Sequence, residues 1–279
     1  IAATDAPAAR GDRTAGRVSV GWRDRLWNAS VMAKQVGDGH DPGTGFVRRK
    51  GIRHGYATLG AHPRPGISLL QEVNPYVEIH YITDLRDVLE TRQATAGLGF
   101  EFRDGGTLDV DYNDRFERLT APFRLQNDIT VPEGAYEFGE LGLRYTSDRA
   151  RRVSGSARIT TGGYFDGDRT STTLSMDWRP SPHLAMELDL RHNAVSLPAG
   201  SFTADVFGAR IGYAWSSRAL ASAFVQYNQA AHLLVSNLRL GVVHAPLSDF
   251  FLVYSERRST AGQGVTDRVI TARSEERRV

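Results

Sequence analysis

The chain has 279 residues, no cysteine and a formal net charge of +2, with a pI of about 9.0. The absence of cysteine excludes disulfides, thiolate metal sites and cysteine nucleophiles, and the scattered arginines form no stripe typical of nucleic-acid binding. Mean hydropathy is −0.36, and no apolar run approaches the roughly 18 residues of a transmembrane helix. A membrane β-barrel is compatible with this composition, because only alternate strand residues face lipid.

The first sixteen residues, IAATDAPAARGDRTAG, have neither the basic start nor the apolar core of a signal peptide. We predict that residues 1–16 form a loop or a disordered segment. The chain also begins without methionine, so we expect a piece of a longer protein.

From residue 17 onward, apolar and polar residues alternate, which is the pattern of strands with one apolar face. In LAMELDLRH, leucine and methionine occupy one face, and Glu187, Asp189 and Arg191 occupy the other. Extended helical periodicity is almost absent. The alternation predicts fifteen strands, at 17–22, 26–34, 53–62, 67–82, 88–103, 107–119, 135–146, 152–165, 169–179, 184–195, 202–216, 219–229, 233–244, 249–258 and 265–273.

The connections between these strands are expected to alternate in length. Short turns are predicted at 23–25, 62–66, 103–106, 147–152, 179–183, 216–219 and 245–249. Longer or irregular connections are predicted between them, chiefly at 35–52, 119–134, 193–202 and 257–267. Short turns on one side and long loops on the other are typical of an outer-membrane barrel. A β-sandwich uses Greek-key crossovers and has no reason to keep this alternation.

Aromatic residues in the apolar register precede most of the short turns. Aromatic side chains at strand ends form the interfacial girdle of membrane barrels, although aromatic residues favour strand ends in other β proteins as well. The predicted girdle consists of Trp22, Phe102, Tyr145, Trp178 and Trp215. We therefore predict an all-β fold, an antiparallel up-and-down transmembrane β-barrel over residues 17–273, with the apolar register facing lipid.

The strand directions predict that this barrel is incomplete or imperfectly closed. Bacterial single-chain barrels have an even number of strands, with both chain ends in the periplasm. The strand at 17–22 runs into a short turn, and the strand at 265–273 runs in the same direction. A barrel with both ends in the periplasm begins with a strand that runs in the opposite direction. The fifteen predicted strands therefore lack an odd number of strands at the N-terminal end. The intact barrel would hold about sixteen or eighteen strands, and the gap would lie between the first and last predicted strands.

Several blocks of sequence resemble a family of uncharacterised bacterial outer-membrane barrels. They include GFVRRKGIRHGYATLG, LETRQATAGLGFEFRDGGTLDVDYNDRFERL, DGDRTS, WRPSPHLAMELDLRHNAVSLPAGSFT, SRALASAFVQYNQ and SNLRLGVVHAPLSDFFLVYSE. In that family the barrel follows a secreted β-sandwich similar to a family 9 carbohydrate-binding module, through which some members are labelled hydrolases. The resemblance covers about residues 17–270 and implies a barrel without assigned catalytic residues.

Two features differ from that family. The sandwich module does not occur in this sequence, which leaves a sugar-binding role without support. Outer-membrane barrels usually close with an amphipathic strand that ends in an aromatic residue, whereas this chain ends in TARSEERRV. A midplane arginine on the lipid face costs roughly 2–4 kcal/mol. We therefore expect residues 274–279 to be an atypical charged tail. Both a native end and a truncated or frame-shifted end remain open.

Charged residues in the polar register are the main candidate functional residues. Both signs occur, so neighbours on adjacent strands can pair and hold the wall together, or the charges can filter solutes in a polar pore. The predicted lumen-facing residues are Glu78, Glu101, Arg103, Asp109, Asp111, Arg144, Arg158, Asp177, Glu187, Asp189, Arg191, Arg210 and Arg239.

Other candidate sites are weaker. Asp166 and Asp168 could bind calcium at a loop tip, but a calcium loop needs more oxygen ligands at regular spacing. His40 and Asp41 lie in a glycine-rich stretch typical of a flexible loop. The basic cluster FVRRKG (46–51) could meet lipopolysaccharide phosphates or an anionic solute, although a solvated loop is more common. We expect no metal, no cofactor, no catalytic residue and no nucleic-acid partner.

Three functions remain open. The preferred one is a non-enzymatic channel, export pore or anchor for a secreted module in the bacterial outer membrane. Its partners would be the lipid bilayer, lipopolysaccharide, and an unidentified small solute or glycan. The first alternative is a hydrolase that acts on glycans, embedded in the barrel or linked to the module. The second is a soluble all-β binding protein.

Overall fold

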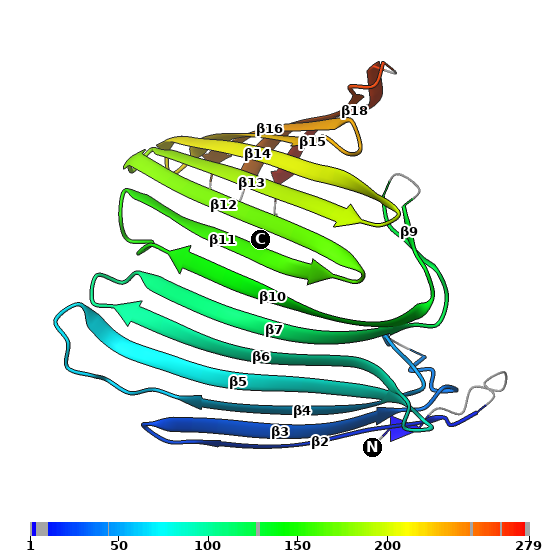
Figure 1. Ribbon diagram of the computed structural model, residues 1–279. Helices are drawn as coiled ribbons and strands as arrows, with labels where there is room; N and C mark the ends of the chain where they lie inside the picture. Colours follow the sequence, from blue (N-terminus) through cyan, green and yellow to red (C-terminus); the bar gives the residue numbers. More distant parts are fainter. Residues whose placement is uncertain are drawn as a thin grey trace. The chain divides into compact units, whose positions relative to one another are not determined.

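The computed structural model describes residues 2–3, 11–43, 45–126, 129–245, 248–262 and 264–276, and these residues form strands and connections (Figure 1). No helix in these ranges is long and apolar enough to cross a membrane. The strands are β1 (Ala2–Ala3), β2 (Thr14–Arg23), β3 (Trp27–Val36), β4 (Ile52–Ala61), β5 (Leu70–Asp84), β6 (Leu89–Phe102), β7 (Thr107–Leu119), β8 (Phe123–Arg124), β9 (Thr130–Val131), β10 (Gly134–Thr146), β11 (Val153–Tyr164), β12 (Gly167–Ser181), β13 (Leu184–Leu197), β14 (Gly200–Ser216), β15 (Ala219–Asn228), β16 (Leu233–Ala245), β17 (Ser248–Ser259) and β18 (Gly264–Glu276).

The long strands form one antiparallel up-and-down sheet in chain order. Fifteen of them, β2–β7 and β10–β18, correspond to the fifteen strands predicted from alternation, with ends that differ by at most three residues. The prediction of an all-β, antiparallel, up-and-down fold is therefore confirmed. The alternation succeeds because side chains on a strand point to opposite faces with a period of two.

The hydrogen-bonded order of the described strands is linear, with β1 at one end and β18 at the other. No pairing in this order joins the two ends, and this agrees with the gap predicted between the first and last strands. β1 contributes a short sixteenth strand, which pairs with β2 through Ala2–Ala15 and Ala3–Thr14. The segment predicted as a loop at 1–16 thus includes β1 and the start of β2, and β18 extends into the predicted tail at 274–279. Residues 277–279 of that tail lie outside the described residues.

The chain divides into two compact units. Unit 1 comprises residues 1–143, 160–169 and 195–201, and unit 2 comprises residues 144–159, 170–194 and 202–279. In both units, one end of the strands carries the connections that were predicted to be short, and we call it the turn end. The connections on the opposite side define the loop end.

Two predicted long connections, 193–202 and 257–267, are in fact tight hairpins. β13 continues to Leu197 and β14 begins at Gly200, which has a φ of +140°. A second glycine, Gly264, has a φ of +68° at the start of β18. Glycine adopts such angles without a Cβ clash, so glycine and proline mark sharp turns here rather than long loops. Of the four connections that were predicted to be long, only those at 37–51 and 120–133 are long in the structure.

The connection between β7 and β10 carries a small core of its own. It forms the two-stranded ribbon β8–β9, in which Phe123 pairs with Val131. Val131 is only 1% exposed, and Ile129 is also buried. A Cβ built at Gly200 would lie 3.3 Å from the Ile129 side chain, so the ribbon packs closely on the β13–β14 turn within unit 1.

We predict that Val131→Ser releases this ribbon. A hydroxyl replaces a fully buried side chain, which should destabilise the local packing by about 2–3 kcal/mol. Limited proteolysis should then cut within 120–133 faster than in the wild type. Ala121→Ser, at an exposed position of the same connection, is the control and should leave the cleavage rate unchanged. Equal rates for both variants would show that Val131 does not hold the ribbon.

Candidate functional site

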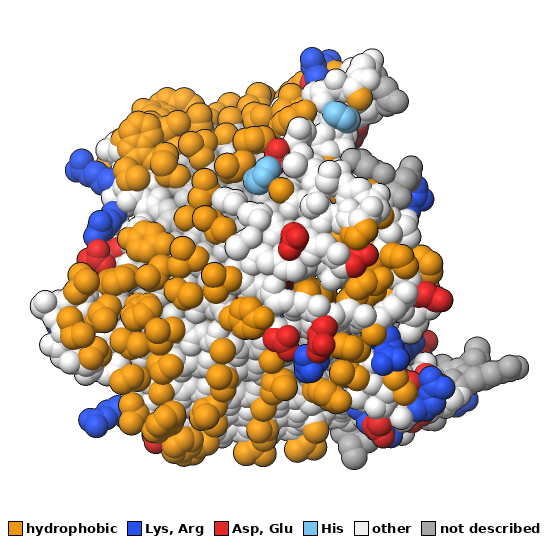
Figure 2. Space-filling model, viewed as in Figure 1, with side chains coloured by type: hydrophobic (Ala, Val, Ile, Leu, Met, Phe, Trp, Pro, Cys, Tyr) orange, Lys and Arg blue, Asp and Glu red, His pale blue; other side chains and the backbone are white. Residues whose placement is uncertain are grey.

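Among the described residues, buried apolar side chains are few and are matched in number by buried polar ones. Hydrophobic side chains gather on the visible face (Figure 2), and the described residues contain few buried ones: Val36, Ile52, Ala61, Ile129, Val131, Val195 and Leu197. Buried polar residues are as numerous: His40, Glu72, Thr83, Asp111, Asn113, Glu140, Ser154 and Ser248. Soluble proteins bury their large apolar residues and rarely bury charged ones.

The exposed apolar side chains follow the predicted register. Leu188 in β13 and Ile211 in β14, both in the apolar register, are 46% and 44% exposed. Met186 and Phe100, which share their register, are half-buried. None of the four belongs to a buried core. We call this side of each unit the apolar face and the opposite side the polar face.

Ionic groups border the apolar face at the loop end. On β6 the apolar face runs from Phe102 to Ala94, and the next residue in register, Arg92, lies 2.7 Å from Asp114 and 2.7 Å from Glu137. Eight residues of strand span about 26 Å, which a tilt of about 40° reduces to roughly 20 Å.

Unit 2 repeats this order on β14. Its apolar face runs over the same number of residues, from Trp215 to Phe207. The next residue in register, Asp205, lies 2.5 Å from the imidazole of His192.

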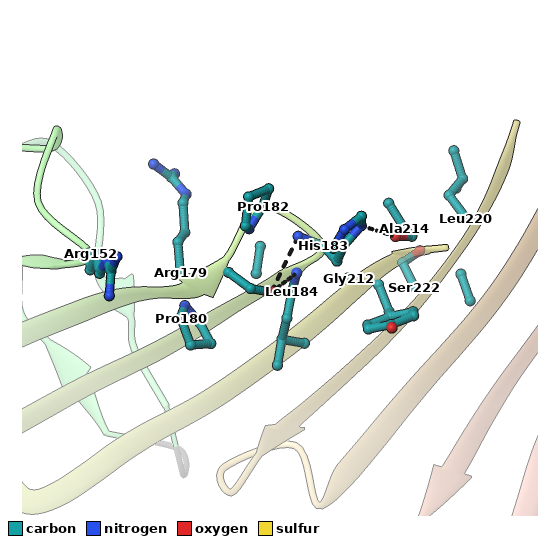
Figure 3. A pocket seen from close by; sticks show the side chains of 14 residues that line it. Arg152, Arg179, Pro180, Pro182, His183, Leu184, Gly212, Ala214, Leu220 and Ser222 are labelled. Atoms are coloured by element: carbon teal, nitrogen blue, oxygen red, sulfur yellow. Dashed lines mark hydrogen bonds between the residues drawn. The ribbon is translucent and has the colours of Figure 1, made fainter. Parts of the chain in front are cut away.

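The predicted aromatic girdle lies at the opposite, turn end. Trp22 and Trp215 are 55% and 57% exposed, Tyr145 and Trp178 are also exposed, and Phe102 is half-buried. All five occupy the apolar face. In unit 2 the girdle adjoins a cleft of about 580 Å³ (Figure 3).

The predicted lumen-facing charges share the polar face, except Arg103, which lies in the connection 103–106. Asp111 is buried; the half-buried members are Glu78, Glu101, Asp109, Arg158 and Asp177; and the exposed ones are Arg103, Arg144, Glu187, Asp189, Arg191, Arg210 and Arg239. They do not converge on one site. They divide into separate contacts, and one of them, Glu78, is contacted by a histidine that the sequence analysis did not select.

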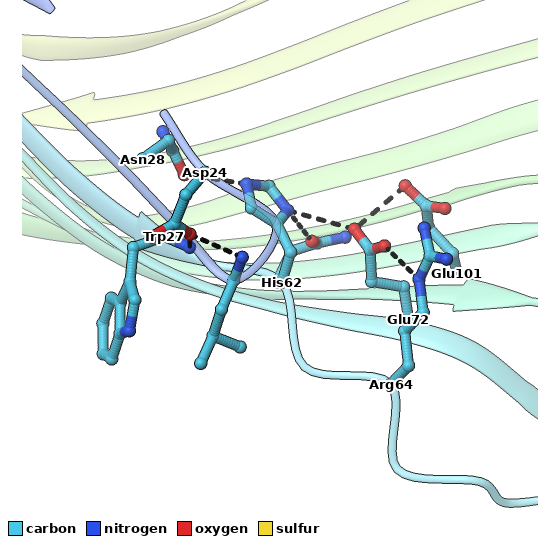
Figure 4. A network of polar contacts seen from close by, with 9 residues as sticks. Asp24, Trp27, Asn28, His62, Arg64, Glu72 and Glu101 are labelled. Atoms are coloured by element: carbon cyan, nitrogen blue, oxygen red, sulfur yellow. Dashed lines mark hydrogen bonds and ion pairs between the residues drawn. The ribbon is translucent and has the colours of Figure 1, made fainter. Parts of the chain in front are cut away.

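The first of these contacts is a network at the turn end of unit 1 (Figure 4). His62 Nδ1 lies 3.0 Å from Glu72 and 2.7 Å from Asn74, and His62 Nε2 lies 2.8 Å from Asn28. Arg64 donates to the other Glu72 oxygen at 3.0 Å. The connection 62–69 is thereby fastened to the polar ends of β3 and β5.

Glu101 extends the same network. It lies directly opposite Glu72 in the β5–β6 register and accepts a hydrogen bond from Asn74 at 3.5 Å. Like charges that face each other across strands are destabilising, and Arg64 and His62 offset that repulsion. Asp24 caps the adjacent turn and accepts bonds from the Trp27 and Leu26 amides at 2.7 Å.

These two amide bonds hold the pKa of Asp24 below its usual value. A depressed pKa stabilises the fold above the ordinary carboxyl range, and this contribution is lost as the pH falls through the folded-state value. The Asp24 turn should therefore loosen in acid.

The second network lies farther along β4 and β5. His54 Nε2 and His80 Nδ1 lie 3.0 Å apart, His80 Nε2 lies 3.1 Å from Glu78, and the Tyr56 hydroxyl donates to Glu78 at 3.0 Å. The rings of Tyr56 and His80 are also in contact, with centroids 4.7 Å apart. Two donors, the Tyr56 hydroxyl and His80 Nε2, thus position the Glu78 carboxylate.

The third network is a buried ion triad. Glu140 is only 1% exposed in its side chain, and it lies 3.4 Å from Arg115 and 2.5 Å from Arg169. Arg169 also lies 4.4 Å above the ring centre of Tyr164, a favourable cation–π geometry. A buried carboxylate is tolerated when it is paired and hydrogen-bonded in this way.

Unit 2 has simpler contacts on its polar face. Arg210 lies 3.3 Å from Glu187 and 5.0 Å from the Phe224 ring centre. Arg239 lies 5.0 Å from the Phe251 ring centre. These arginines place their guanidinium groups over aromatic rings and remain exposed to solvent.

The weaker candidates form no site among the described residues. His40 is buried, with Nδ1 3.0 Å from the Arg13 carbonyl, so it holds the chain at the start of β2. Asp166 lies in the tight β11–β12 turn and Asp168 in β12. Arg49 of the basic cluster pairs with Glu90 at 2.7 Å. Among the residues that the structure describes, no group of three or more histidine or carboxylate side chains could hold a metal ion.

The sequence analysis missed His54, His62, His80, Glu72 and Glu140. All except His62 lie on strands in the polar register. Their place in the polar register could have identified them, because Glu72 and Glu140 are charged and His54 and His80 alternate with apolar residues in the same way. His62 lies in a connection, so no periodicity could have marked it.

Comparisons with known proteins add no further information. A scan against protein-family models, a search of the curated proteins and a search of the solved structures each returned no match.

We predict that Glu140→Gln destabilises unit 1 by about 3 kcal/mol, because it leaves two arginines beside a neutral amide. Urea unfolding in detergent micelles measures this change. Glu117→Gln is the control, since Glu117 is less deeply buried and lies on β7 like Arg115. A loss for Glu140→Gln no larger than that for the control would contradict a structural role for the triad.

Proposed function

We propose that this protein is an outer-membrane β-barrel of a bacterial envelope that acts without catalysis, as a channel, an export pore or a membrane anchor. The observation that supports this most strongly is the two-sided sheet. Its apolar face is exposed and bordered by aromatic residues at one end and by ion pairs at the other, while its polar face carries buried carboxylates. Outer-membrane barrels have an outward-facing apolar band flanked by aromatic girdles, and the exposed apolar face with its aromatic border at the turn end supports the proposal in this respect.

The depth of the apolar stretch agrees with this proposal. Roughly 20 Å of height, estimated for β6 and β14, approaches the apolar band of about 25 Å in outer-membrane barrels. An edge of unpaired strands is costly within lipid, so in a membrane the edges of β2 and β18 require a partner.

The charges of the polar face favour passage of ions or small polar solutes. In unit 1 its turn-end part is mainly acidic, with Glu72, Glu101, Asp109 and Asp111 on adjacent strands. Acidic walls attract cations. The resemblance to barrels that follow a carbohydrate-binding module supports an envelope location. The described residues show no catalytic arrangement that would favour the alternative of a hydrolase.

Membrane insertion has a direct test in two matched arginine variants. Ile211→Arg places a charge in the apolar band and should cost roughly 2–4 kcal/mol, whereas Asp189→Arg, on the polar face, should cost much less. The measurement is the fraction of protein that resists alkaline carbonate extraction from vesicles, together with urea unfolding. A wild-type chain that stays monomeric and folded in buffer without detergent would show that the protein is soluble.

Conduction is tested in planar bilayers. The wild-type protein should give discrete steps with a cation preference, measured as a reversal potential in a salt gradient. Glu101→Gln removes one acidic charge and should reduce that preference, while Glu133→Gln, in an exposed part of a connection, should not. Inserted protein without conductance would leave the anchor role and exclude the channel.

A further inference from the structure

Three side chains that are cationic or can become so stand in one row across β2, β3 and β4, on the polar face of unit 1. Arg17 is directly opposite Lys34 in the β2–β3 register, and Lys34 is directly opposite His54 in the β3–β4 register. Side chains that face each other in this way have Cβ atoms about 5 Å apart. We call these three residues the cationic row.

The neighbours of the cationic row on the polar face carry no charge. Ile82, which is opposite His54 on β5, is apolar. The residues that precede and follow the row in the same register of β2, β3 and β4 are also uncharged: Ala15, Ser19, Met32, Val36, Ile52 and Tyr56. The strand register therefore places no carboxylate beside Arg17 or Lys34.

The carboxylates farther along β5 have other partners. Asp84 lies 3.1 Å from the Arg86 guanidinium, and Glu78 lies 3.1 Å from His80. Among the described residues, no carboxylate is within ion-pair distance of Arg17 or Lys34. The positive charge of the cationic row is thus not neutralised by the part of the chain that the structure describes.

This arrangement has an energetic cost that a bound anion would offset. Like charges directly opposite each other on neighbouring strands destabilise a sheet, whereas Arg210 on the same kind of face has Glu187 at 3.3 Å. Val36 and Ile52, next to the row, are 2% and 5% exposed. Buried apolar groups lower the local dielectric constant, which strengthens the attraction between the row and an anion.

The long connection 37–51 adds positive charge at the same end of the strands. It joins β3 to β4, and it begins three residues after Lys34 and ends three residues before His54. Its basic cluster at 46–51 includes Arg48 and Lys50, which are both exposed. A concentration of like charge raises the local concentration of counter-ions, so the cluster assists the approach of an anion to this end of unit 1.

We propose that the cationic row is a binding site for a phosphate group, held by Arg17 and Lys34 beside His54. A phosphate group carries a charge of about −1.5 to −2 and three acceptor oxygens, which suits two permanent cations better than a carboxylate does. The planar fork of arginine binds two phosphate oxygens, and lysine supplies a point charge. The row lies on the polar face, opposite the exposed apolar side chains, so the ligand is free phosphate or a small solute that bears one.

Equilibrium dialysis of the whole chain in detergent micelles against radiolabelled inorganic phosphate tests this site, with chloride keeping the ionic strength constant. The wild type should bind phosphate saturably, at one site per chain. The double variant Arg17→Gln, Lys34→Gln should lower the affinity about tenfold or more, because hydrogen bonds between charged groups are stronger than neutral ones.

Arg23→Gln combined with Arg25→Gln is the matched control. It removes two charges at the turn end of the same β2–β3 hairpin, about 20 Å along the strand from the row, and it should retain the wild-type affinity. Folded wild-type protein that does not bind phosphate saturably, or equal affinities for the two double variants, would overturn the proposal.

Urea unfolding separates a loss of binding from a loss of folding. Without phosphate, the variant Arg17→Gln, Lys34→Gln should unfold at the same urea concentration as the wild type or at a higher one, because it relieves the repulsion between facing cations. With phosphate, the wild type and the control should gain more stability than this variant does. Equal gains for all three proteins would count against the site.

Competition identifies the source of the phosphate group. Displacement of the radiolabel by glucose 6-phosphate but not by glucose assigns the site to solutes that bear a phosphate group, and displacement by inorganic phosphate alone assigns it to free phosphate. Chloride that displaces the radiolabel as well as phosphate does would refute a phosphate site. These measurements require neither membrane insertion nor conduction, so a failure to bind phosphate would leave the proposed barrel function standing.

Discussion

The period-two alternation of side chains across the sheet is the constraint on which the rest of the structure depends. Successive strand residues face opposite sides, so one choice of register assigns every apolar and charged residue of a strand to its face. Val18, Val20 and Trp22 share the apolar face of β2 for this reason, and Arg17 and Arg23 share the other. A slip of one residue would move both sets at once, which makes the register strongly specified.

In this arrangement the contacts that stabilise the fold lie mainly on the polar face, because the apolar face is exposed. The few buried apolar side chains supply little hydrophobic core, so the polar face is held by hydrogen bonds and ion pairs. Glu140 is stabilised by two arginines, and Glu72 by Arg64 and His62. Buried charges that keep all their partners specify one geometry, whereas the loss of one partner is costly.

The two ends of the strands are chemically different. The turn end carries aromatic residues and exposed arginines, and the loop end carries compensated pairs such as Arg92 with Asp114 and Glu137. Aromatic rings and arginine both suit an interface where apolar and polar surroundings meet. This asymmetry distinguishes the two ends of the sheet and agrees with the proposed membrane location.

The sequence by itself determined the fold class, the fifteen long strands and the register of the charged residues on them, because alternation is a local property with a fixed period. Arg103, which the sequence analysis assigned to a strand, lies in a connection instead. It also placed the aromatic girdle, since Trp178 and Trp215 precede recognisable turns. Only the tertiary structure decided which polar residues meet. Glu140 and Arg169 are distant in the chain, and their pairing depends on strand register. Nor could the sequence reveal the tight β13–β14 turn, because proline and glycine mark short and long connections alike. How far the strands continue, to Leu197 in β13 and from Gly200 in β14, depends on their pairing in the folded sheet.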